Sequence, residues 1–459
     1  MNNSSLRFSL PSFAGKIGFA QADITPPVGI YSRNWGAAKN DIAEGIHRPL
    51  SARVLALQSN DSEKPLLLIS LDLGWWKNRQ DEWYVRGAVL EEFGLDESQV
   101  LINLTHTHAG PVFCRDDKDK RGGEFIERYL EKVRDAVLEA SRNALAGSTP
   151  ATLAWATGTC NLAQDRDLPD PNGERIVCGF HPNTFADVTL LVGRVTDANN
   201  EVLCILANYA CHPTTLAWEN NLISPDWVGA YYETIHNQIG APAMFLQGAS
   251  GELQARETYT GNVEIADAQG RQFAFAVLST LQTMLPAKMQ LEYSGVVESG
   301  APLAKWKRVA SAPSTQVSSQ RLEVEVPLKE LESVAEIEAA LSICEDRMMR
   351  ERLTRKMRVR LTVGEGRCTR LPFWIWELGD AIFVAQREEA YSVFQMELRR
   401  RFPDKAIIVM NLTNGSCGYL PPDNLYDLNI YQVWQTPYAR GCAEILMDAA
   451  KSQIELIKG

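Results

Sequence analysis

The stretch VLINLTHTHAGPVF, residues 100–113, joins an apolar run to two of the chain's six histidines. The run predicts a buried strand over 98–106, and the Ala-Gly-Pro after His108 predicts a turn. If the strand continued, His106 and His108 would point to the same side, because side chains alternate along a strand. Such a pair can present imidazoles to a metal ion, and two hydrogen-bonded histidines at the edge of the core are the alternative.

The segments around this stretch alternate between strand and helix patterns. Apolar runs at 50–57 and 65–76 have the length of strands, while 79–95 and 122–145 have the spacing of amphipathic helices. The order strand, strand, helix, strand, helix is typical of an α/β fold. In such folds the functional sites lie at the ends of strands, so the histidine stretch is in a position suited to chemistry.

A second strand pattern also ends in a histidine. The run LCILANYACHP, residues 203–213, ends in His212 followed by a proline. Helix patterns follow at 224–240 and 264–285. Because strand ends converge in α/β folds, we expect His106 and His212 to share one site.

The region 296–370 differs from the rest of the chain. It holds a polar loop, a strand pattern and a charged helix expected over 334–360, and we interpret it as an inserted α+β subdomain. The main part of the catalytic domain would then span 1–295, and a C-terminal part over 371–459 would complete the site. The basic run RMMRERLTRKMRVR, residues 347–360, could bind an anion, but interleaved acidic residues favour a solvated helix face.

The composition of the 459-residue chain predicts a large globular protein. It is 45% hydrophobic, and its formal charge of −11 argues against nucleic acid as the main partner. The N-terminal residues lack the pattern of a signal peptide, and no segment reaches the roughly 20 apolar residues of a transmembrane helix. Nine cysteines without close pairs predict mostly buried thiols in a reducing compartment, and hence a cytoplasmic protein. The oligomeric state stays open, with a homo-oligomer among the alternatives.

Three short motifs occur in the order known from one enzyme family. A Gly…Asp-Ile-Thr segment lies at 18–25, a Gly-Ile-His…Ala-Arg segment at 45–53, and THTHAGP at 105–111. The last resembles the Thr-His-Thr-His-Ser-Gly-Pro that ends a strand in neutral/alkaline (non-lysosomal) ceramidases, which are zinc amidases that cleave N-acyl sphingosines. The resemblance extends from 15 to 450 and implies the layered α/β fold with mixed sheets of that family's catalytic domain.

The resemblance also implies one Zn²⁺ per chain, held in that family by two His, one Glu and one Tyr. The matching positions here are His106, His212, Glu389 and Tyr419. Glu388 is the alternative carboxylate, because the Pro-Gly that precedes the family's glutamate is not kept. Such a ligand set leaves one position on zinc open for a water, whose pKa the metal lowers to roughly 7.

Two polar residues are candidates for supporting roles in catalysis. His108 could donate to an oxyanion or pass a proton to the leaving group, and the alternative is that it only orients its loop. Asp226, in Ser-Pro-Asp, could orient His212 or simply cap the helix that follows it.

Four residues are candidates for substrate binding. Asp72 lies at a strand end, where it could meet substrate or only cap a turn. The flat apolar faces of Trp35, Trp75 and Trp76 could hold an acyl chain or stack on a sugar ring, and core packing is the alternative for them.

The positions tied to the substrate depart from the family. Its Gly-Asp-x-Ser-Pro motif, whose serine is tied to ceramide cleavage, corresponds to Gly-Glu-Leu-Gln-Ala at 251–255. Gln254 therefore stands in place of that serine and is a candidate catalytic residue. The chain is also expected to lack the C-terminal immunoglobulin-like domain of true ceramidases.

These observations predict a zinc-dependent hydrolase that attacks an amide bond of an N-acylated lipid or small molecule. A zinc-dependent glycoside hydrolase on the same scaffold is the alternative, because one scaffold hosts many chemistries. A non-catalytic, zinc-stabilised binding protein is a third interpretation.

Overall fold

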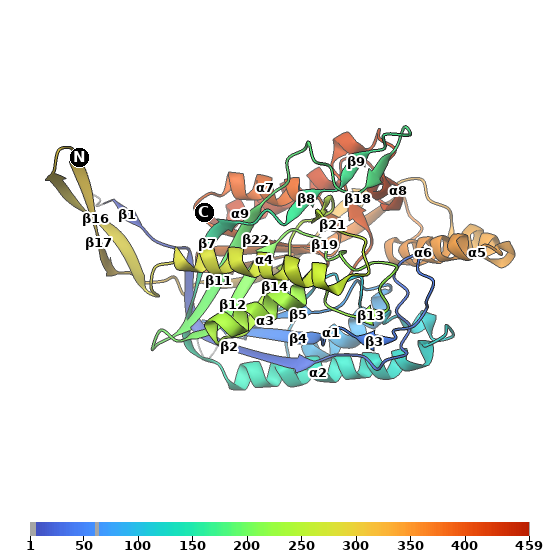
Figure 1. Cartoon of the computed structure of the whole chain (residues 1–459), viewed down its shortest axis with the longest axis horizontal. Helices are drawn as coiled ribbons and strands as arrows, with labels where there is room; N and C mark the ends of the chain where they lie inside the picture. Colours follow the sequence, from blue (N-terminus) through green and yellow to red (C-terminus); the bar gives the residue numbers. More distant parts are fainter. Residues whose placement is uncertain (1–5, 60–63, 459) are drawn as a thin grey trace.

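The computed structural model describes residues 6–59 and 64–458. Residues 1–5 lie outside the described residues. They belong to the N-terminal stretch that lacks the pattern of a signal peptide. Two sheets lie face to face, with helices on the outer side of each (Figure 1). The result is a four-layered arrangement of helix, sheet, sheet and helix.

The larger sheet has eight strands in the order β14-β12-β11-β7-β2-β4-β5-β6. In that order the strands span Ala243–Gln247, Val202–Tyr209, Thr189–Asp197, Thr149–Thr159, Ser12–Asp23, Ser51–Gln58, Leu66–Leu71 and Val100–Leu104. The pairs β5–β6 and β12–β14 are parallel and the others are antiparallel, so the sheet is mixed. β6 and β12 carry the chain towards His106 and His212, as the apolar runs predict.

Four helices cover one face of this sheet. They are α1 (Arg79–Phe93), α2 (Ile126–Ala146), α3 (Trp227–Ile239) and α4 (Val263–Gln282). α1 and α2 pack on β4, β5 and β6, and α3 and α4 pack on β7, β11, β12 and β14. Burial on both faces explains why these strands read as continuous apolar runs.

The smaller sheet has the order β18-β19-β20-β22 and packs against the opposite face of the larger one. Its strands span Val317–Pro327, Cys368–Leu378, Ala381–Gln386 and Ala406–Met410. Helices α7 (Ser392–Arg401) and α9 (Cys442–Lys458) cover its outer side. Large aromatic side chains such as Trp155 and Phe383 meet between the two sheets, with ring centroids 5.8 Å apart.

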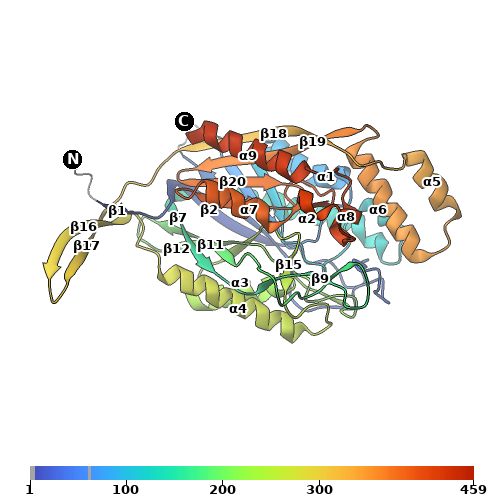
Figure 2. The ribbon, with the colours of Figure 1, turned by 90° about the horizontal axis from the view of Figure 1, so that it is seen from above.

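The segments of 296–370 lie in three places (Figure 2). β16 (Met289–Glu298) and β17 (Pro302–Ala310) pair with β1 (Arg7–Phe8) in a hairpin that projects at one end. β18 joins the smaller sheet, and α5 (Val334–Ile343) and α6 (Arg347–Val363) extend at the opposite end. A separate subdomain with these boundaries stays a prediction.

The single helix expected over 334–360 is wrong, because the chain forms two helices there. Cys344 is extended, with φ −80° and ψ 116°, which ends α5. The Asp346 side chain then accepts a hydrogen bond from the backbone N–H of Met349 and caps α6. A capping residue inside a helical pattern is a start signal, and here it outweighs the continuous spacing.

No helix among residues 6–59 and 64–458 is both long and apolar enough to span a bilayer. All nine cysteines lie in the described part of the chain as free thiols, and six of them are buried. The reducing compartment inferred from them stays a prediction.

Candidate metal centre

His106 follows the end of β6 in a tight turn. β6 ends at Leu104, so the strand does not continue to His108. His106 has φ 73°, a left-handed conformation that costs a non-glycine residue about 1–2 kcal/mol. Its backbone N–H donates to the carbonyl of Leu73 (2.9 Å), and its Nδ1 lies 3.0 Å from the carbonyl of Gly74. These contacts hold the strained turn and aim Nε2 into the site.

His212 is held in a similar way beyond the end of β12. Its backbone N–H donates to the carbonyl of Leu253 (2.9 Å), and its Nδ1 lies 3.1 Å from the same oxygen. The side chain is buried. Burial, reinforced by the nearby Arg166 guanidinium, lowers the pKa of His212 to about 3, so the imidazole is neutral at pH 7.

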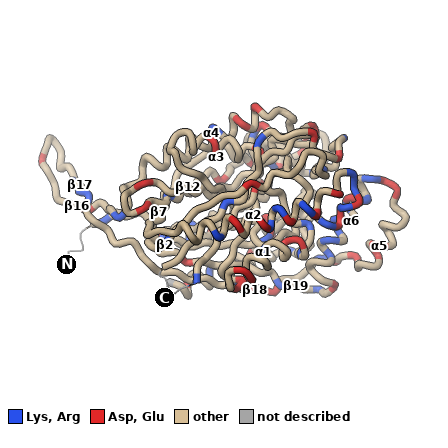
Figure 3. Tube along the Cα trace, turned by 90° about the horizontal axis from the view of Figure 1, so that it is seen from below, with Lys and Arg blue, Asp and Glu red and all other residues tan. Residues whose placement is uncertain are grey.

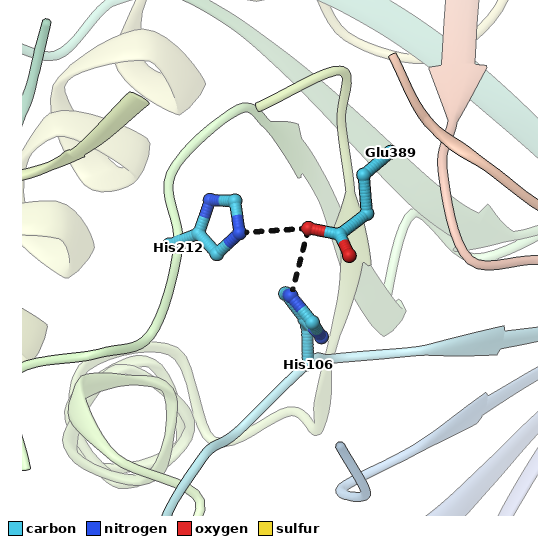
Figure 4. Close-up of side chains that lie close together, drawn as sticks. All are labelled: His106, His212 and Glu389. Atoms are coloured by element: carbon cyan, nitrogen blue, oxygen red, sulfur yellow. Dashed lines mark hydrogen bonds and ion pairs between the residues drawn. The ribbon is translucent and has the colours of Figure 1, made fainter. Parts of the chain in front are cut away.

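Glu389 begins the short strand β21 (Glu389–Ala390) and supplies a carboxylate between the two imidazoles (Figure 4). Its Oε2 lies 3.0 Å from Nε2 of His212 and 3.3 Å from Nε2 of His106. Burial alone would raise the pKa of Glu389, but the two histidines outweigh it and hold that pKa well below its usual value. Glu389 is therefore an anionic oxygen donor at the meeting point of three segments.

The donor set of this triad fits a divalent metal ion. Nδ1 of each histidine faces a carbonyl oxygen, which can only accept a hydrogen bond, so Nδ1 carries a proton and Nε2 is the atom that can bind a cation. The two Nε2 atoms and the Glu389 oxygen lie within 4.8 Å of one another. Electron-pair donors that converge in this way need a cation between them, and two imidazoles with one carboxylate are typical zinc ligands.

Tyr419 lies beside Glu389 on the neighbouring strand. β23 (Tyr419–Leu420) runs parallel to β21, with Tyr419 in register with Glu389, so both side chains project to the same face. The Tyr419 hydroxyl accepts a hydrogen bond from Nη2 of Arg166 (3.1 Å). Burial, with the Glu389 charge next, raises the pKa of this phenol well above its usual value.

His108 lies between the triad and two tryptophans. Its Nε2 is 3.4 Å from Nε2 of His106, so the turn brings the two histidines together without a continuing strand. The ring centroid of His108 lies 5.0 Å from that of Trp35 and 4.9 Å from that of Trp75. His108 and Trp35 also line a cavity of about 20 Å³, enough for about one water. Burial lowers the pKa of His108 well below its usual value.

Comparison with known proteins identifies the family of the chain. The family described as neutral/alkaline non-lysosomal ceramidase, N-terminal, matches residues 16–244. The chain belongs to the neutral/alkaline ceramidase family. The resemblance drawn from the three motifs is thereby confirmed.

Two curated ceramidases are similar in sequence. The neutral ceramidase of Pseudomonas aeruginosa is 25% identical over 262 residues, which are 54% of this chain and 38% of that protein. The neutral ceramidase of Mycobacterium tuberculosis is 28% identical over 194 residues, 40% of this chain and 29% of that protein. The matched part therefore spans well under half the length of either ceramidase.

Two solved ceramidase structures share the fold. A ceramidase complexed with C2 has a TM-score of 0.69 at 16% identity, and the P. aeruginosa neutral ceramidase crystal structure has 0.68 at 17%. In both comparisons 96% of this chain and 74% of the other are covered. The predicted layered α/β fold of neutral-ceramidase type is thereby confirmed.

The alternative carboxylate, Glu388, points away from the ceramidase-family triad. Its Oε1 accepts hydrogen bonds from Nε of Arg387 (2.7 Å) and from the hydroxyl of Tyr438 (2.7 Å). Adjacent residues of an extended segment face opposite sides, which is why only one of the pair can meet the histidines. The geometry therefore selects Glu389.

Asp72 and Asp226 have structural contacts in place of the predicted ones. Asp72 is buried, and its Oδ2 accepts hydrogen bonds from the backbone N–H and the hydroxyl of Ser51 (2.9 and 2.6 Å), so it links the end of β5 to the start of β4. Asp226 accepts from the backbone N–H groups of Leu216 (2.8 Å) and Trp227 (2.7 Å). It therefore caps α3, and the carbonyl of Leu253 orients His212 instead.

The three candidate tryptophans separate into two groups. Trp35 and Trp75 are half-buried and pack on His108. Trp76 is only 2% exposed and packs edge-on against Phe113 with centroids 5.0 Å apart, so the prediction that it binds substrate is wrong. Successive side chains at this strand end alternate between the site and the core.

Gln254, in place of the ceramidase-family serine, is buried and fully engaged. Its Nε2 donates to the carbonyl of Gly179 (3.1 Å), and its Oε1 accepts from the hydroxyl of Tyr259 (2.7 Å). Tyr259 in turn stacks on Trp218, with centroids 5.8 Å apart, and contacts Trp35 edge-on. Gln254 is thus connected to Trp35 through the side chain of Tyr259.

Arg166 is the functional side chain that sequence reasoning missed. It is only 4% exposed, and its Nη2 donates to the carbonyl of Gly251 (2.7 Å) and to the Tyr419 hydroxyl. Its position, between the short strands β8 (Ala163–Asp165) and β9 (Asp167–Pro169), has no periodicity or motif that marks it. Its contact with Tyr419 and its effect on the pKa of His212 show that it belongs to the site.

Proposed function

We propose that this protein is a zinc-dependent hydrolase that cleaves an amide bond of an N-acylated lipid or small molecule. The observation that carries the proposal is the convergence of His106, His212 and Glu389, with both Nδ1 atoms already held by carbonyl oxygens. Membership of the ceramidase family supports a hydrolase, and the nitrogen and oxygen donors support zinc. None of the comparisons favours the glycoside hydrolase alternative.

The proposed zinc ligands are Nε2 of His106, Nε2 of His212, a carboxylate oxygen of Glu389 and the hydroxyl of Tyr419. When bound, zinc lowers the pKa of a water and polarises a carbonyl oxygen. Arg166 holds the Tyr419 hydroxyl through a 3.1 Å hydrogen bond, which restrains the phenol beside the carboxylate. The carbonyls of Gly74 and Leu253 keep the imidazoles in the tautomer that can bind a cation.

His108 is the proposed proton carrier. It lies next to the triad, and its buried Nδ1 has no hydrogen-bond partner among the described residues. A ring nitrogen free of other partners can accept a proton and deliver it to the departing amine nitrogen. The absence of a hydrogen-bond partner for Nδ1 among the described residues supports this role, because no fixed contact competes for the proton.

Trp35 and Trp75 are the proposed walls of the substrate site. The ring of each tryptophan packs against the ring of His108, and together they present apolar surface next to the triad. Such surface suits the acyl part of the substrate and excludes water from the reaction. Gln254 is a positioning residue in this scheme, because it holds Tyr259 against Trp35.

The experiment combines metal analysis with turnover. Protein purified without added metal should contain about one zinc per chain, and chelation should abolish release of amine from N-acyl substrates until zinc is restored. Less than about a tenth of an equivalent, with no gain on zinc addition, overturns the metal site. A full zinc load without turnover of any N-acyl compound supports the zinc-stabilised binding protein, and release of reducing sugar from aryl glycosides supports the glycosidase.

A further inference from the structure

Two cationic side chains lie near the triad without an acidic partner. Lys77 follows Trp75 and Trp76, and its Nζ lies 5.3 Å from the ring centroid of Trp75. Arg355 lies on α6 and donates from Nη1 to the hydroxyl of Tyr431 (3.1 Å). Both side chains are half-buried. Neither has a carboxylate within ion-pair distance in the described part of the chain.

Both cations are connected to the metal centre. The ring of Trp75, under Lys77, packs against His106 and His108 with centroids 5.8 and 4.9 Å away. Tyr431, the partner of Arg355, packs edge-on against Tyr419 at 5.6 Å. Arg355 also lies within electrostatic reach of Lys77 and of Glu389. Each cation is therefore separated from a proposed zinc ligand by one aromatic ring, Lys77 from His106 by Trp75 and Arg355 from Tyr419 by Tyr431.

The nearby acidic residues are already paired with other arginines. Asp117 forms an ion pair with Arg358 (3.1 Å), and Glu351 forms one with Arg33 (2.8 Å). Asp41 is paired with Arg347. Basic residues recur along α6 at this end of the molecule (Figure 3). Arg358 also lies 3.5 Å from Asp116, so Asp116 and Asp117 share one arginine, and none of these carboxylates forms an ion pair with Lys77 or Arg355 among the described residues.

A half-buried cation that lacks a carboxylate within ion-pair distance is stabilised by an anionic ligand. Burial lowers the pKa of Lys77 to about 8, against the effect of the nearby Asp117 carboxylate. Burial also opposes the charge of Arg355, but Tyr431, Tyr419 and Glu389 outweigh it and raise the pKa of Arg355. A carboxylate or phosphate group bound between an ammonium and a guanidinium would satisfy both through charge-assisted hydrogen bonds. Glu389 cannot serve, because its carboxylate already faces the two histidines.

We infer that Lys77 and Arg355 form an anion-binding subsite, so that the substrate is an N-acyl compound carrying a carboxylate or phosphate group. This inference rests on the proposed amidase function for the reaction, but the anion site itself rests only on the two cations and their surroundings. α6, which carries Arg355, thus supplies a specificity determinant to a centre built by the strands. The subsite separates this protein's substrate from an uncharged N-acyl lipid.

The test compares hydrolysis of three matched compounds by the zinc-loaded protein. N-dodecanoylglycine carries a carboxylate, N-dodecanoylethanolamine O-phosphate carries a phosphate, and N-dodecanoylethanolamine is neutral. We expect kcat/KM for at least one anionic compound to exceed that for the neutral one by about a hundredfold, and the two anions to show which oxyanion fits. Equal kcat/KM for all three overturns the inference.

Substitutions test whether Lys77 and Arg355 cause the preference for anionic compounds. Arg355→Met and Lys77→Met should each reduce the preference for the anion about tenfold, and Arg355→Lys should retain most of it because the charge is kept. Arg352→Met is the matched control, because Arg352 is an exposed residue of the same helix and should leave the preference unchanged. An equal loss for anionic and neutral compounds in the first two variants contradicts the subsite.

A binding measurement separates this inference from the proposed function. Hexylphosphonate, which the protein cannot hydrolyse as an amide, is titrated calorimetrically into the zinc-loaded wild type and the same variants. Binding that weakens about tenfold in Arg355→Met and Lys77→Met supports the subsite even if no N-acyl compound is hydrolysed. Binding that is absent, or unchanged by these substitutions, overturns it even if the amidase activity is real.

Discussion

Glu388 and Glu389 are neighbours in the chain, yet the structure assigns them to different tasks, and replacing each by glutamine separates those tasks. Glu389 faces His212 and His106 at 3.0 and 3.3 Å. Glu388 is buried and pairs with Arg387 and Tyr438. We therefore expect Glu389→Gln to impair metal binding and Glu388→Gln to impair stability.

The sizes of the two effects follow from these contacts. A structural zinc site contributes roughly 10–16 kcal/mol at pH 7, so one ligand of four accounts for about 3–4 kcal/mol, or on the order of 10²–10³-fold in the zinc Kd. Glu388→Gln leaves the half-buried Arg387 guanidinium without its counter-charge. Loss of one partner of a buried pair lowers the free energy of unfolding by about 3 kcal/mol, while the zinc Kd should stay within about threefold.

Competition titration against a chromophoric chelator measures the zinc Kd, and urea unfolding of the metal-free protein measures stability. The unsubstituted protein and Arg352→Met serve as references in both assays. The reasoning is refuted if Glu388→Gln is the variant that loses zinc, since the ligand would then lie one residue earlier. It is also refuted if both variants bind zinc normally, because no carboxylate would then complete the site.

Further predictions concern four other residues of the site and its surroundings. Burial raises the pKa of Asp226 to about 6, above its ordinary 3.8. Between these two pH values the folded state therefore binds more protons than the unfolded state. The contribution of Asp226 to the free energy of unfolding is lost as the pH rises from about 4 to 6. The difference in unfolding free energy between wild type and Asp226→Asn should shift in favour of the variant by about 2 kcal/mol between pH 4 and pH 7, and a difference independent of pH contradicts this account. His108→Gln should lower kcat by about 10²–10³-fold with zinc content unchanged, and a loss of zinc would instead make His108 a ligand. Trp75→Ala should raise KM about tenfold at nearly constant stability, whereas Trp76→Ala should lower the free energy of unfolding by about 3–5 kcal/mol and leave KM unchanged; the opposite assignment would place Trp76 at the substrate.

Much of the fold could be predicted because its signals are local. Apolar runs of strand length predicted β4, β5 and β6, and amphipathic spacing predicted α1 to α4. The split of 334–360 into two helices was missed because Asp346 acts as a helix cap only once its side chain is free to bond the backbone ahead of it.

The candidate site was predictable where a residue stands at a strand end. His106 and His212 could be expected to meet because strand ends in an α/β fold converge. The same argument misassigned Asp72, which also lies at a strand end but whose Oδ2 accepts two hydrogen bonds from Ser51 and whose Oδ1 accepts one from the Tyr232 hydroxyl. Position at a strand end predicts that a residue lies near a site, but it does not predict which groups form hydrogen bonds with that residue.

The sequence by itself determined the elements and the donor types, because apolar periodicity and the chemistry of His, Glu and Tyr do not depend on distant contacts. Only the tertiary structure decided which neighbour of each pair faces the metal centre: Glu389 and not Glu388, Trp75 and not Trp76. That choice depends on which surface each strand end packs against. The roles of three cations, Arg166, Arg355 and Lys77, likewise depend on the tertiary structure. Segments far apart in sequence bring these side chains near one centre, and the nearby acidic residues pair with other arginines.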